Sequence, residues 1–436
     1  MGKKKSVQNF GKNGIFVILM SFFCYWIGTC FGGAGMSNTV IPALAEIRGF
    51  HAATMMSWCS LAGWISIPFV VIWAKVGERR GPKTVIVIAL IIAAAAIFLL
   101  GTTKTLAVWI LALVISSCLA SGYLYYAAPG LIANWFPTKK GLALGWASMG
   151  IICCDLLWTP YIAKAFQAFG ATTTFLVIGV IVLIIAGVVA LFVKNTPEEK
   201  GCYPDNDPTS DKHRDLIARI TREYQSDWSI LRLLKRRETW LIGIAGGMLW
   251  FGSAGSIISF FPRMTSLGYD QTFISRVFQI AAFFSLIGSW LYGYIDSRIG
   301  TKKTLLIFCA VDFLCVGLMF LLAPVGKVWV VIAFVGLEAC VGGIPNLIAS
   351  MQATIWGRWD YAACSKVITP IVLLILNTVF ILTSFSVTQF GNYNFVYIVM
   401  LAFIVIGCVL VSRIRTQSIG KTDEDIMAMY APKEEV

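Results

Sequence analysis

The chain has 436 residues, of which 58% are hydrophobic and only 13% are charged. Soluble domains carry about 25% charged residues, so this composition excludes an ordinary soluble protein and indicates one that spans a lipid bilayer. The formal net charge of +13 is compatible with nucleic-acid binding, so the positions of the basic residues must decide what that charge means.

Twelve apolar segments, each long enough to cross about 30 Å of hydrocarbon as a helix, follow one another along the chain. We predict one membrane-spanning helix for each, and hence an all-α membrane protein. The expected bounds are 14–44, 52–76, 84–101, 106–135, 141–166, 172–194, 238–266, 272–295, 303–323, 327–355, 363–390 and 393–413.

The basic residues follow the alternation of the loops. All but seven of the 35 Lys and Arg lie in the terminal segments or in loops after even-numbered helices. The exceptions are Arg48, Lys104, Arg263 and Lys327 in the opposite loops and Lys164, Arg276 and Lys366 within predicted helices. By the positive-inside rule, both termini are expected in the cytoplasm. The charge therefore reflects topology, and no nucleic-acid partner is expected.

The amino terminus and the cysteines do not indicate a secreted protein. A basic patch at residues 3–5 precedes an apolar run that is too long for a signal peptide and lacks a small-residue cleavage site. Of the 12 Cys, only Cys202 lies in a predicted loop, so we expect no disulfide framework, metal site or cofactor. The two His, at positions 51 and 213, lie in or beside loops, and we expect no enzyme activity.

The two halves of the chain repeat each other. The segment at 31–35 recurs at 251–255 and Pro42 recurs as Pro262, while 129–133 recurs at 345–349. Each half has an even number of helices, so both enter the membrane in the same direction as parallel repeats. We predict a six-helix half at 1–194, a linker at 195–236 with a surface helix from 212, a second half at 237–415 and a cytoplasmic tail at 416–436.

Two related charged turns occupy the same place in each half, one between the second and third helices and one between the eighth and ninth. They contain Glu78, Arg79, Gly81 and Lys83 in the first half and Asp296, Arg298, Gly300 and Lys302 in the second. This pattern resembles the signature loop of the major facilitator superfamily. The resemblance implies an alternating-access carrier in which these gate turns hold the halves together at the cytoplasmic side. An acid there can meet the positive amino end of a helix or a nearby cation. By the same resemblance, the first, fourth, seventh and tenth helices line a central cavity, and every third helix supports it from outside.

Ionisable residues inside the predicted helices are candidates for chemistry, because they are costly there and usually face a cavity. Lys366 begins a polar stripe that continues through Asn377 on one side of its helix, although a lysine so placed can also extend to the membrane surface. Arg276 shares a face with Gln279 near the outer end of its helix, and the same two interpretations apply.

Two acids lie near the middle of their helices. Asp155 and Glu338 could balance Lys366 or Arg276, carry a proton or bind a cationic substrate, and the sequence leaves these alternatives open. Six aromatic residues could form a stackable cavity wall, with ordinary packing as the alternative for each. They are Tyr123, Tyr125, Tyr126, Trp146, Trp158 and Trp250, and Tyr126, near the repeated Pro129, is the one to test first.

The segments at 296–303 and 134–141 resemble the oxalate:formate antiporter family and its monocarboxylate-transporter relatives. In that family a Lys on the eleventh helix and an Arg on the eighth bind a carboxylate, which by resemblance points to Lys366 and Arg276. The leading hypothesis is a monomeric antiporter or proton symporter of a small organic anion in a bacterial cytoplasmic membrane. The alternatives are a proton-coupled carrier of a cationic or zwitterionic compound that uses Asp155 and Glu338, and a sensor that does not transport.

Overall fold

The computed structural model describes residues 9–32, 40–50, 52–207, 220 and 223–430, and its regular elements within these ranges are all helices. Twelve of the helical segments are long and apolar enough to span a membrane. The prediction of an all-α membrane protein with twelve spans is therefore confirmed.

The first half contains the helices that precede residue 195. They are α1 (Gly11–Gly32), α2 (Ile41–Arg48), α3 (Ala52–Arg80), α4 (Pro82–Thr102), α5 (Leu106–Gly122), η2 (Tyr123–Ala127), α6 (Ala128–Trp135), α7 (Lys140–Cys153), η3 (Cys154–Trp158), α8 (Thr159–Phe169) and α9 (Ala171–Phe192). The short elements of the linker are η4 (Glu198–Lys200), η5 (Pro204–Asn206) and α11 (Ile230–Leu234).

The second half and the tail follow. Their helices are α12 (Arg237–Ser266), α13 (Gln271–Ile299), α14 (Thr301–Leu322), α15 (Lys327–Trp356), α16 (Tyr361–Leu376), α17 (Thr378–Phe390), α18 (Asn394–Ser412) and α19 (Asp423–Tyr430). From the second predicted span onward, most helix bounds lie within a few residues of those expected. Residues 212–219 of the expected linker helix lie outside the described residues.

Several predicted spans differ from single straight helices. The first was expected over 14–44, but α1 ends at Gly32, residues 33–39 are outside the described part and α2 is separate. The fourth and fifth spans contain the π-helices η2 and η3, each followed by a proline at the start of the next helix. Proline lacks an N–H and its ring crowds the preceding turn, so the regular hydrogen-bond pattern is interrupted there. The eleventh span is divided at Asn377.

The residues of the predicted gate turns lie mostly in helices. Helix α3 continues to Arg80 and α13 to Ile299, so Glu78 and Asp296 belong to the last turns of these helices. The turns themselves are made by Gly81 and Gly300, with φ of +81° and +85°. These values lie in a region that favours glycine, which explains why each helix ends abruptly there.

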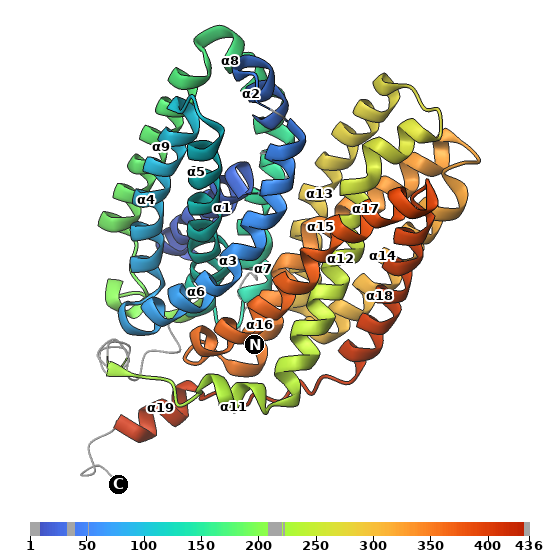
Figure 1. Ribbon diagram of the computed structural model, residues 1–436. Coiled ribbons are helices and arrows are strands. Elements are labelled where there is room, and N and C mark those ends of the chain that lie inside the picture. Colours follow the sequence, from blue (N-terminus) through green and yellow to red (C-terminus); the bar gives the residue numbers. More distant parts are fainter. Residues whose placement is uncertain (1–8, 33–39, 51, 208–219, 221–222, 431–436) are drawn as a thin grey trace.

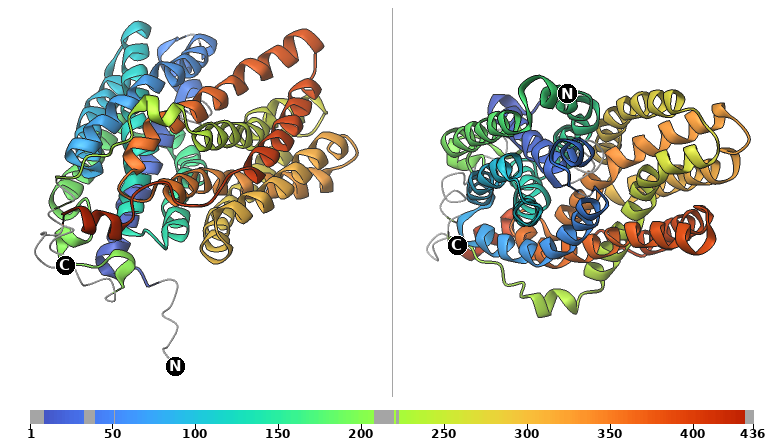
Figure 2. Two further views of the ribbon diagram at one scale, coloured as in Figure 1. Left: turned by 90° about the horizontal axis from the view of Figure 1, so that it is seen from below. Right: turned by 45° about the horizontal axis from the view of Figure 1, so that its top comes forward.

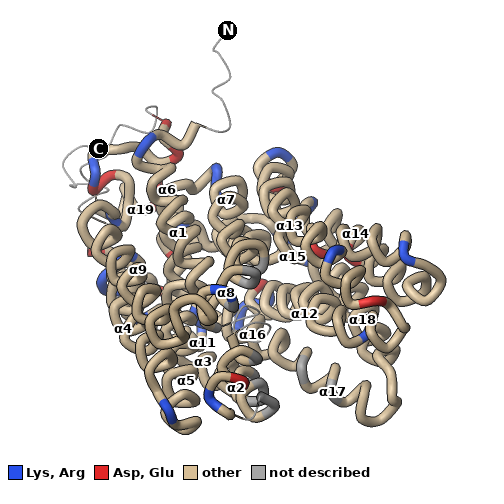
Figure 3. The backbone as a smooth tube through the Cα atoms, turned by 90° about the horizontal axis from the view of Figure 1, so that it is seen from above, with Lys and Arg blue, Asp and Glu red and all other residues tan. Residues whose placement is uncertain are grey.

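The helices form two groups, one from each half, and each group has its own apolar core. The groups approach each other near the end that carries α11 and α19 and diverge toward the end that carries α2 and α8 (Figure 1). Figure 2 shows the two groups side by side in further views. Lys, Arg, Asp and Glu lie mainly near helix ends, and most of each helix is free of them (Figure 3). We call the end with α11 and α19 the closed end.

Candidate functional site

A cavity of about 1130 Å³ lies between the two helix groups. Its lining comes from α1, α3, α5, η2, α6 and the fifth span in the first half and from α12, α13, α15, α16 and α17 in the second. Among the described residues, α4, α9, α14 and α18 contribute nothing to the lining. The division into lining and supporting helices agrees with the resemblance, and the volume suits a small molecule.

The described lining is mostly apolar and contains no Lys, Arg, Asp or Glu. Hydroxyl and amide groups are distributed around it, and they include those of Tyr25, Thr29, Ser117, Gln279, Gln352, Thr369 and Asn377. Gln352 is fixed by Ser365, whose Oγ donates to its Oε1 at 2.9 Å. Such groups can orient a ligand by hydrogen bonds, while the apolar surface packs against its hydrocarbon part.

Aromatic side chains from both halves meet inside the cavity. Tyr125 of η2 and Trp250 of α12 make an edge-on contact, with ring centroids 6.2 Å apart and planes at 68°. Phe261 and Phe278, also in the lining, lie 5.3 Å apart. The cavity therefore offers aromatic faces and edges to a planar or apolar group.

Lys366 forms an ion pair across the two halves. Its Nζ lies 2.5 Å from Oε1 of Glu78, which is in the last turns of α3. The side chains are 9% and 23% exposed, respectively. Thr369 and Leu373 line the cavity three and seven residues further along α16. At about 100° per residue, these spacings place Lys366 on the same side of α16 as Thr369 and Leu373, while Lys366 itself is not among the described lining residues.

The other predicted site residues divide into two sets. Trp250, Gln279 and Asn377 line the cavity. Arg276 is exposed and is not part of the lining, although Gln279 one turn away is. Glu338 is buried in α15, outside the lining; its backbone carbonyl accepts a hydrogen bond from Ser285 at 2.7 Å. The side chain of Asp155 lies outside the described part of the structure.

Two aromatic residues expected in the cavity wall lie elsewhere. Tyr126 is fully buried and its ring packs against Gly77 of α3, directly beside Glu78. Trp146 is 40% exposed on α7 and absent from the lining. The preceding residue, Gly145, faces α13, so the side chain of Trp146 is turned about 100° away from α13.

Helices α7 and α13 make a second contact between the halves. Gly145 approaches α13 so closely that a Cβ there would lie 2.8 Å from the carbonyl oxygen of Ser289. Ser289 donates from Oγ to the carbonyl oxygen of Gly145 at 2.8 Å, and its Oγ lies 2.7 Å from that of Ser148. Small residues that let backbones approach, with hydroxyl hydrogen bonds, are typical of helix contacts in membranes.

The acid of the second gate turn lies in this contact. Asp296 is buried against Gly141 at the amino end of α7, where a helix carries partial positive charge. Ser350 of α15 donates to its Oδ2 at 2.6 Å. The basic gate residues lie further out: Arg79 and Arg298 are exposed, and Lys302 donates to the carbonyl oxygen of Ile414 at 2.8 Å. In the first gate turn, the N–H of Lys83 donates to Asn195 at 2.9 Å, beside Gly81.

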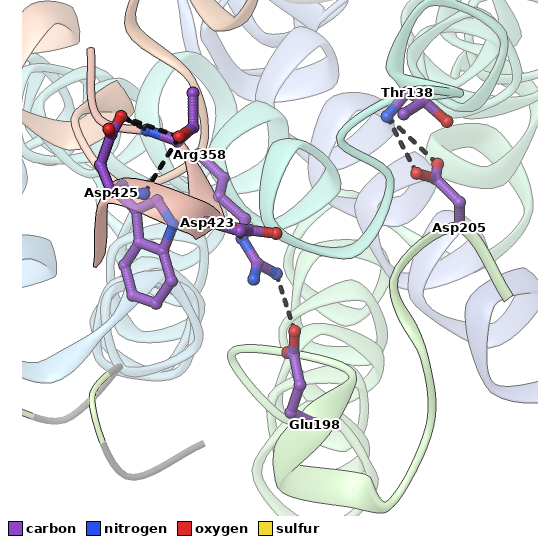
Figure 4. Close-up of polar contacts among 8 residues, drawn as sticks. Thr138, Glu198, Asp205, Arg358, Asp423 and Asp425 are labelled. Atoms are coloured by element: carbon purple, nitrogen blue, oxygen red, sulfur yellow. Dashed lines mark hydrogen bonds and ion pairs between the residues drawn. The ribbon is translucent and has the colours of Figure 1, made fainter. Parts of the chain in front are cut away.

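The linker and the tail both bind the turn at 357–360, between α15 and α16. Arg358 pairs with Glu198 of the linker through Nη1 and with Asp423 of the tail through Nε, each at 2.8 Å (Figure 4). Asp360 accepts from the hydroxyls of Tyr224 at 2.9 Å and Ser226 at 2.5 Å. The linker therefore makes specific contacts beyond a simple tether.

A further linker contact holds the loop between α6 and α7. Asp205 accepts from the backbone N–H groups of Thr138 and Lys139, at 3.0 and 2.9 Å, as Figure 4 shows for Thr138. The linker thus contacts loops of both halves at the closed end.

Comparisons with known proteins agree with this architecture. A family model described as Major Facilitator Superfamily matches residues 17–358. The oxalate:formate antiporter of Oxalobacter formigenes is 23% identical over 240 residues, which are 54% of this chain and 53% of the antiporter. The match thus spans about half the length of that curated relative.

Three solved transporters share the fold. The proton:xylose symporter XylE, bound to 6-bromo-6-deoxy-D-glucose, has a TM-score of 0.67 at 15% identity, covering 95% of this chain and 99% of XylE. The human organic anion transporter MFSD10 (TETRAN) has a TM-score of 0.68 at 12% identity, covering 92% and 99%. FucP in its outward conformation has a TM-score of 0.67 at 13% identity, covering 91% and 98%. Because the family model covers most of the chain and these transporters share its twelve-helix fold, the chain belongs to the major facilitator superfamily.

Proposed function

We propose that the chain is a secondary active transporter that moves a small organic anion with a carboxylate group across the membrane, by exchange or together with protons. The observation that carries this proposal is the position of Lys366. Lys366 lies on the side of α16 that carries the lining residues Thr369 and Leu373, and the described lining of the cavity has no charge of its own. The similarity to the oxalate:formate antiporter of Oxalobacter formigenes supports an anionic substrate.

The substrate lies between Lys366 and the aromatic contact in this proposal. A carboxylate accepts charge-assisted hydrogen bonds from the ammonium, and these are about twice as strong as neutral ones. Thr369 and Gln352 supply neutral hydrogen bonds near the same depth, and Tyr125 and Trp250 pack against the remainder of the molecule. Asn377 and Gln279 bound the cavity closer to its open end.

Transport follows from rocking of the two halves about this site. We take 1–194 and 237–415 as the moving halves, joined by the linker, with both termini in the cytoplasm as the basic loops indicate. The cavity then opens outward in this conformation, and closure of the outer end brings the rim toward the substrate. Arg276, one turn from Gln279, is proposed to contact the anion only after that closure.

The cationic-substrate alternative would use Glu338, which is buried in α15 outside the described lining. Uptake by proteoliposomes distinguishes the two. Radiolabelled formate, oxalate and benzoate would be offered to the purified full chain, and amines would be added as competitors. We expect carboxylates, and not amines, to be transported and to compete.

The variant Lys366→Gln tests the site. Removing the cation that a buried carboxylate binds costs about 2–5 kcal/mol, which corresponds to a loss of roughly 30-fold or more in transport at low substrate concentration. Lys104→Gln, which removes an exposed loop lysine, is the matched control. The double variant Lys366→Gln/Glu78→Gln avoids leaving Glu78 unpaired in case the single variant folds poorly. If either Lys366 variant carries every accepted carboxylate at the normal rate, the site assignment is wrong.

A further inference from the structure

We propose that Glu78 is an internal competitor of the substrate, so that a carboxylate entering the cavity replaces it on Lys366 and thereby breaks an ion pair that holds the closed end. This inference rests on the proposed function and adds a role for a residue of the first gate turn. Through this exchange, binding of a substrate in the cavity weakens the contact between the two halves.

The ion pair has a special place among the contacts of the closed end. Glu78 is on α3 and Lys366 on α16, so their 2.5 Å contact joins membrane-spanning helices of different halves. Within the described part of the chain, no other ion pair does so. The contact of α7 with α13 relies on glycines and hydroxyls, which a cavity ligand with a single carboxylate has no reason to displace.

The ammonium of Lys366 is already bound to a carboxylate of the protein, that of Glu78. The described lining is uncharged, and Lys366, one turn of α16 before the lining residue Thr369, is a cation to which Glu78 is already bound. Sharing the ammonium would bring two carboxylates close together in a partly buried site, where like charges repel strongly. The two carboxylates therefore exclude each other, and the substrate must take the place of Glu78.

The surroundings allow this exchange. The lysine ammonium lies on a flexible four-carbon stem, so it can turn from α3 toward the cavity without movement of α16. Glu78 keeps 23% of its side chain exposed, so water can solvate the carboxylate once it is released. On the other side, Gly77 is held by the ring of Tyr126, which fixes this turn of α3 and presents Glu78 to the lysine.

The exchange supplies what a conformational change requires. A ligand shifts an equilibrium only through a difference in its affinity for the two conformations. Here the difference arises because Lys366 is free for the substrate only when the bond to Glu78 is broken. A neutral molecule of similar shape would fill the cavity but leave the ion pair intact, so it would not promote opening of the closed end.

The test compares carboxylate binding by four forms of the full chain in lipid nanodiscs: the unmodified protein, Glu78→Gln, Lys366→Gln, and the exchanged double variant Glu78→Lys/Lys366→Glu. The probes are formate, oxalate and benzoate, with benzamide as the neutral isostere of benzoate. Glu46→Gln, which removes an exposed acid on α2, is the matched control. A pair of spin labels across the closed end reports its opening.

We expect Glu78→Gln to bind the accepted carboxylate about tenfold more tightly, because the competitor no longer reduces the fraction of lysine that is free. Benzoate should open the closed end of the unmodified protein and benzamide should not. The exchanged variant should keep the thermal stability of the unmodified protein but bind no carboxylate, because the residue on α16 is then an acid. If the ion pair only stabilised the fold, the exchanged variant would match the unmodified protein in both thermal stability and carboxylate binding.

The outcomes separate this inference from the proposed function. If Lys366→Gln abolishes carboxylate binding while Glu78→Gln binds with unchanged affinity, Glu78 does not compete and the inference is overturned, whereas the proposed function stands. If none of the three carboxylates binds to any form, the proposed function is wrong and the inference is overturned with it. If Glu78→Gln does not fold, Glu78→Asp replaces it, and the shorter side chain should also bind carboxylates more tightly than the unmodified protein.

Discussion

The ion pairs of Arg358 lead to a quantitative prediction for the variant Arg358→Ala. The guanidinium is 5% exposed and the carboxylate of Glu198 is 1% exposed, so this pair is buried. Burial lowers the pKa of Arg358, but the carboxylates of Glu198 and Asp423 outweigh it and hold that pKa above its ordinary value. The charged form of Arg358 is therefore favoured in the folded protein.

Removing the arginine leaves Glu198 buried without its cation. Breaking one partner of a buried pair costs about 3–5 kcal/mol. Nη2 of Arg358 and Oε2 of Glu198 have no hydrogen-bond partner among the described residues, so the pair is incompletely satisfied and the lower end, about 3 kcal/mol, is expected. By contrast, Asp423 is 38% exposed, so Asp423→Asn should cost less than about 1 kcal/mol.

The double variant Arg358→Met/Glu198→Gln separates the loss of a contact from the cost of an unpaired charge. It removes both charges, and such replacements are often nearly neutral, so we expect most of the stability to return. The assay is the midpoint of denaturant unfolding in detergent, together with the rate at which a protease cuts the linker, because Glu198 can also escape burial if the linker detaches. If Arg358→Ala changes neither quantity more than Asp423→Asn does, the assignment of a buried, stabilising pair is wrong.

Two further predictions concern the closed end. Gly145→Ala places a Cβ 2.8 Å from the carbonyl oxygen of Ser289, a backbone atom that cannot move without shifting α13, so overpacking should disfavour this conformation by about 1–3 kcal/mol. Cysteine labelling at the closed end should therefore become faster. Gly317→Ala is the control, because nothing lies within 4 Å of its new Cβ and the labelling rate should not change. Burial, and after it the Asp360 carboxylate, raise the pKa of Tyr224. The stability that Tyr224 contributes is therefore complete below its unfolded pKa of about 10 and is lost as the pH rises further. Protease cutting of the linker should increase above about pH 10 in the unmodified protein, and Tyr224→Phe, compared at each pH, should remove this dependence.

The spans were predictable from sequence because a helix in lipid needs a long apolar segment, and each charged turn interrupts one. The cavity residues Gln279 and Asn377 were predictable for a related reason: polar groups at depth in a helix must face something other than lipid. The repeat, the charged turns and these polar groups are all properties of a local stretch of sequence.

Tyr125 and Tyr126 were both candidates for the cavity wall, with Tyr126 placed first because it lies near the repeated Pro129, yet Tyr125 is the one that lines the cavity. Counting 100° per residue assumes a regular α-helix, but η2 contains an extra residue per turn just before Pro129. That change of register turns Tyr125 toward the cavity and Tyr126 toward Gly77. Proline four residues ahead was the available signal, because it disrupts the turn before it.

The partner of Lys366 was also beyond prediction from one sequence. Glu78 is 288 residues away and belongs to the other half, so no local pattern relates the two. The contacts of Arg358 with Glu198 and Asp423 have the same character, since each connects segments that are distant in the chain. Polar pairs of this kind depend on how the halves meet, which composition and periodicity do not specify.

The contacts that join the two halves at the closed end are those expected for helices in a lipid bilayer. Apolar helix surfaces gain little by leaving lipid for each other, so membrane helices associate through close packing and polar contacts. The closed end accordingly combines glycine packing of α7 on α13 with the ion pair of α3 and α16. Close packing is insensitive to what occupies the cavity, whereas an ion pair can exchange one partner for a ligand of the same charge. The contact that can respond to a carboxylate is therefore the ion pair, whose cation lies on the side of α16 that carries the lining residues Thr369 and Leu373.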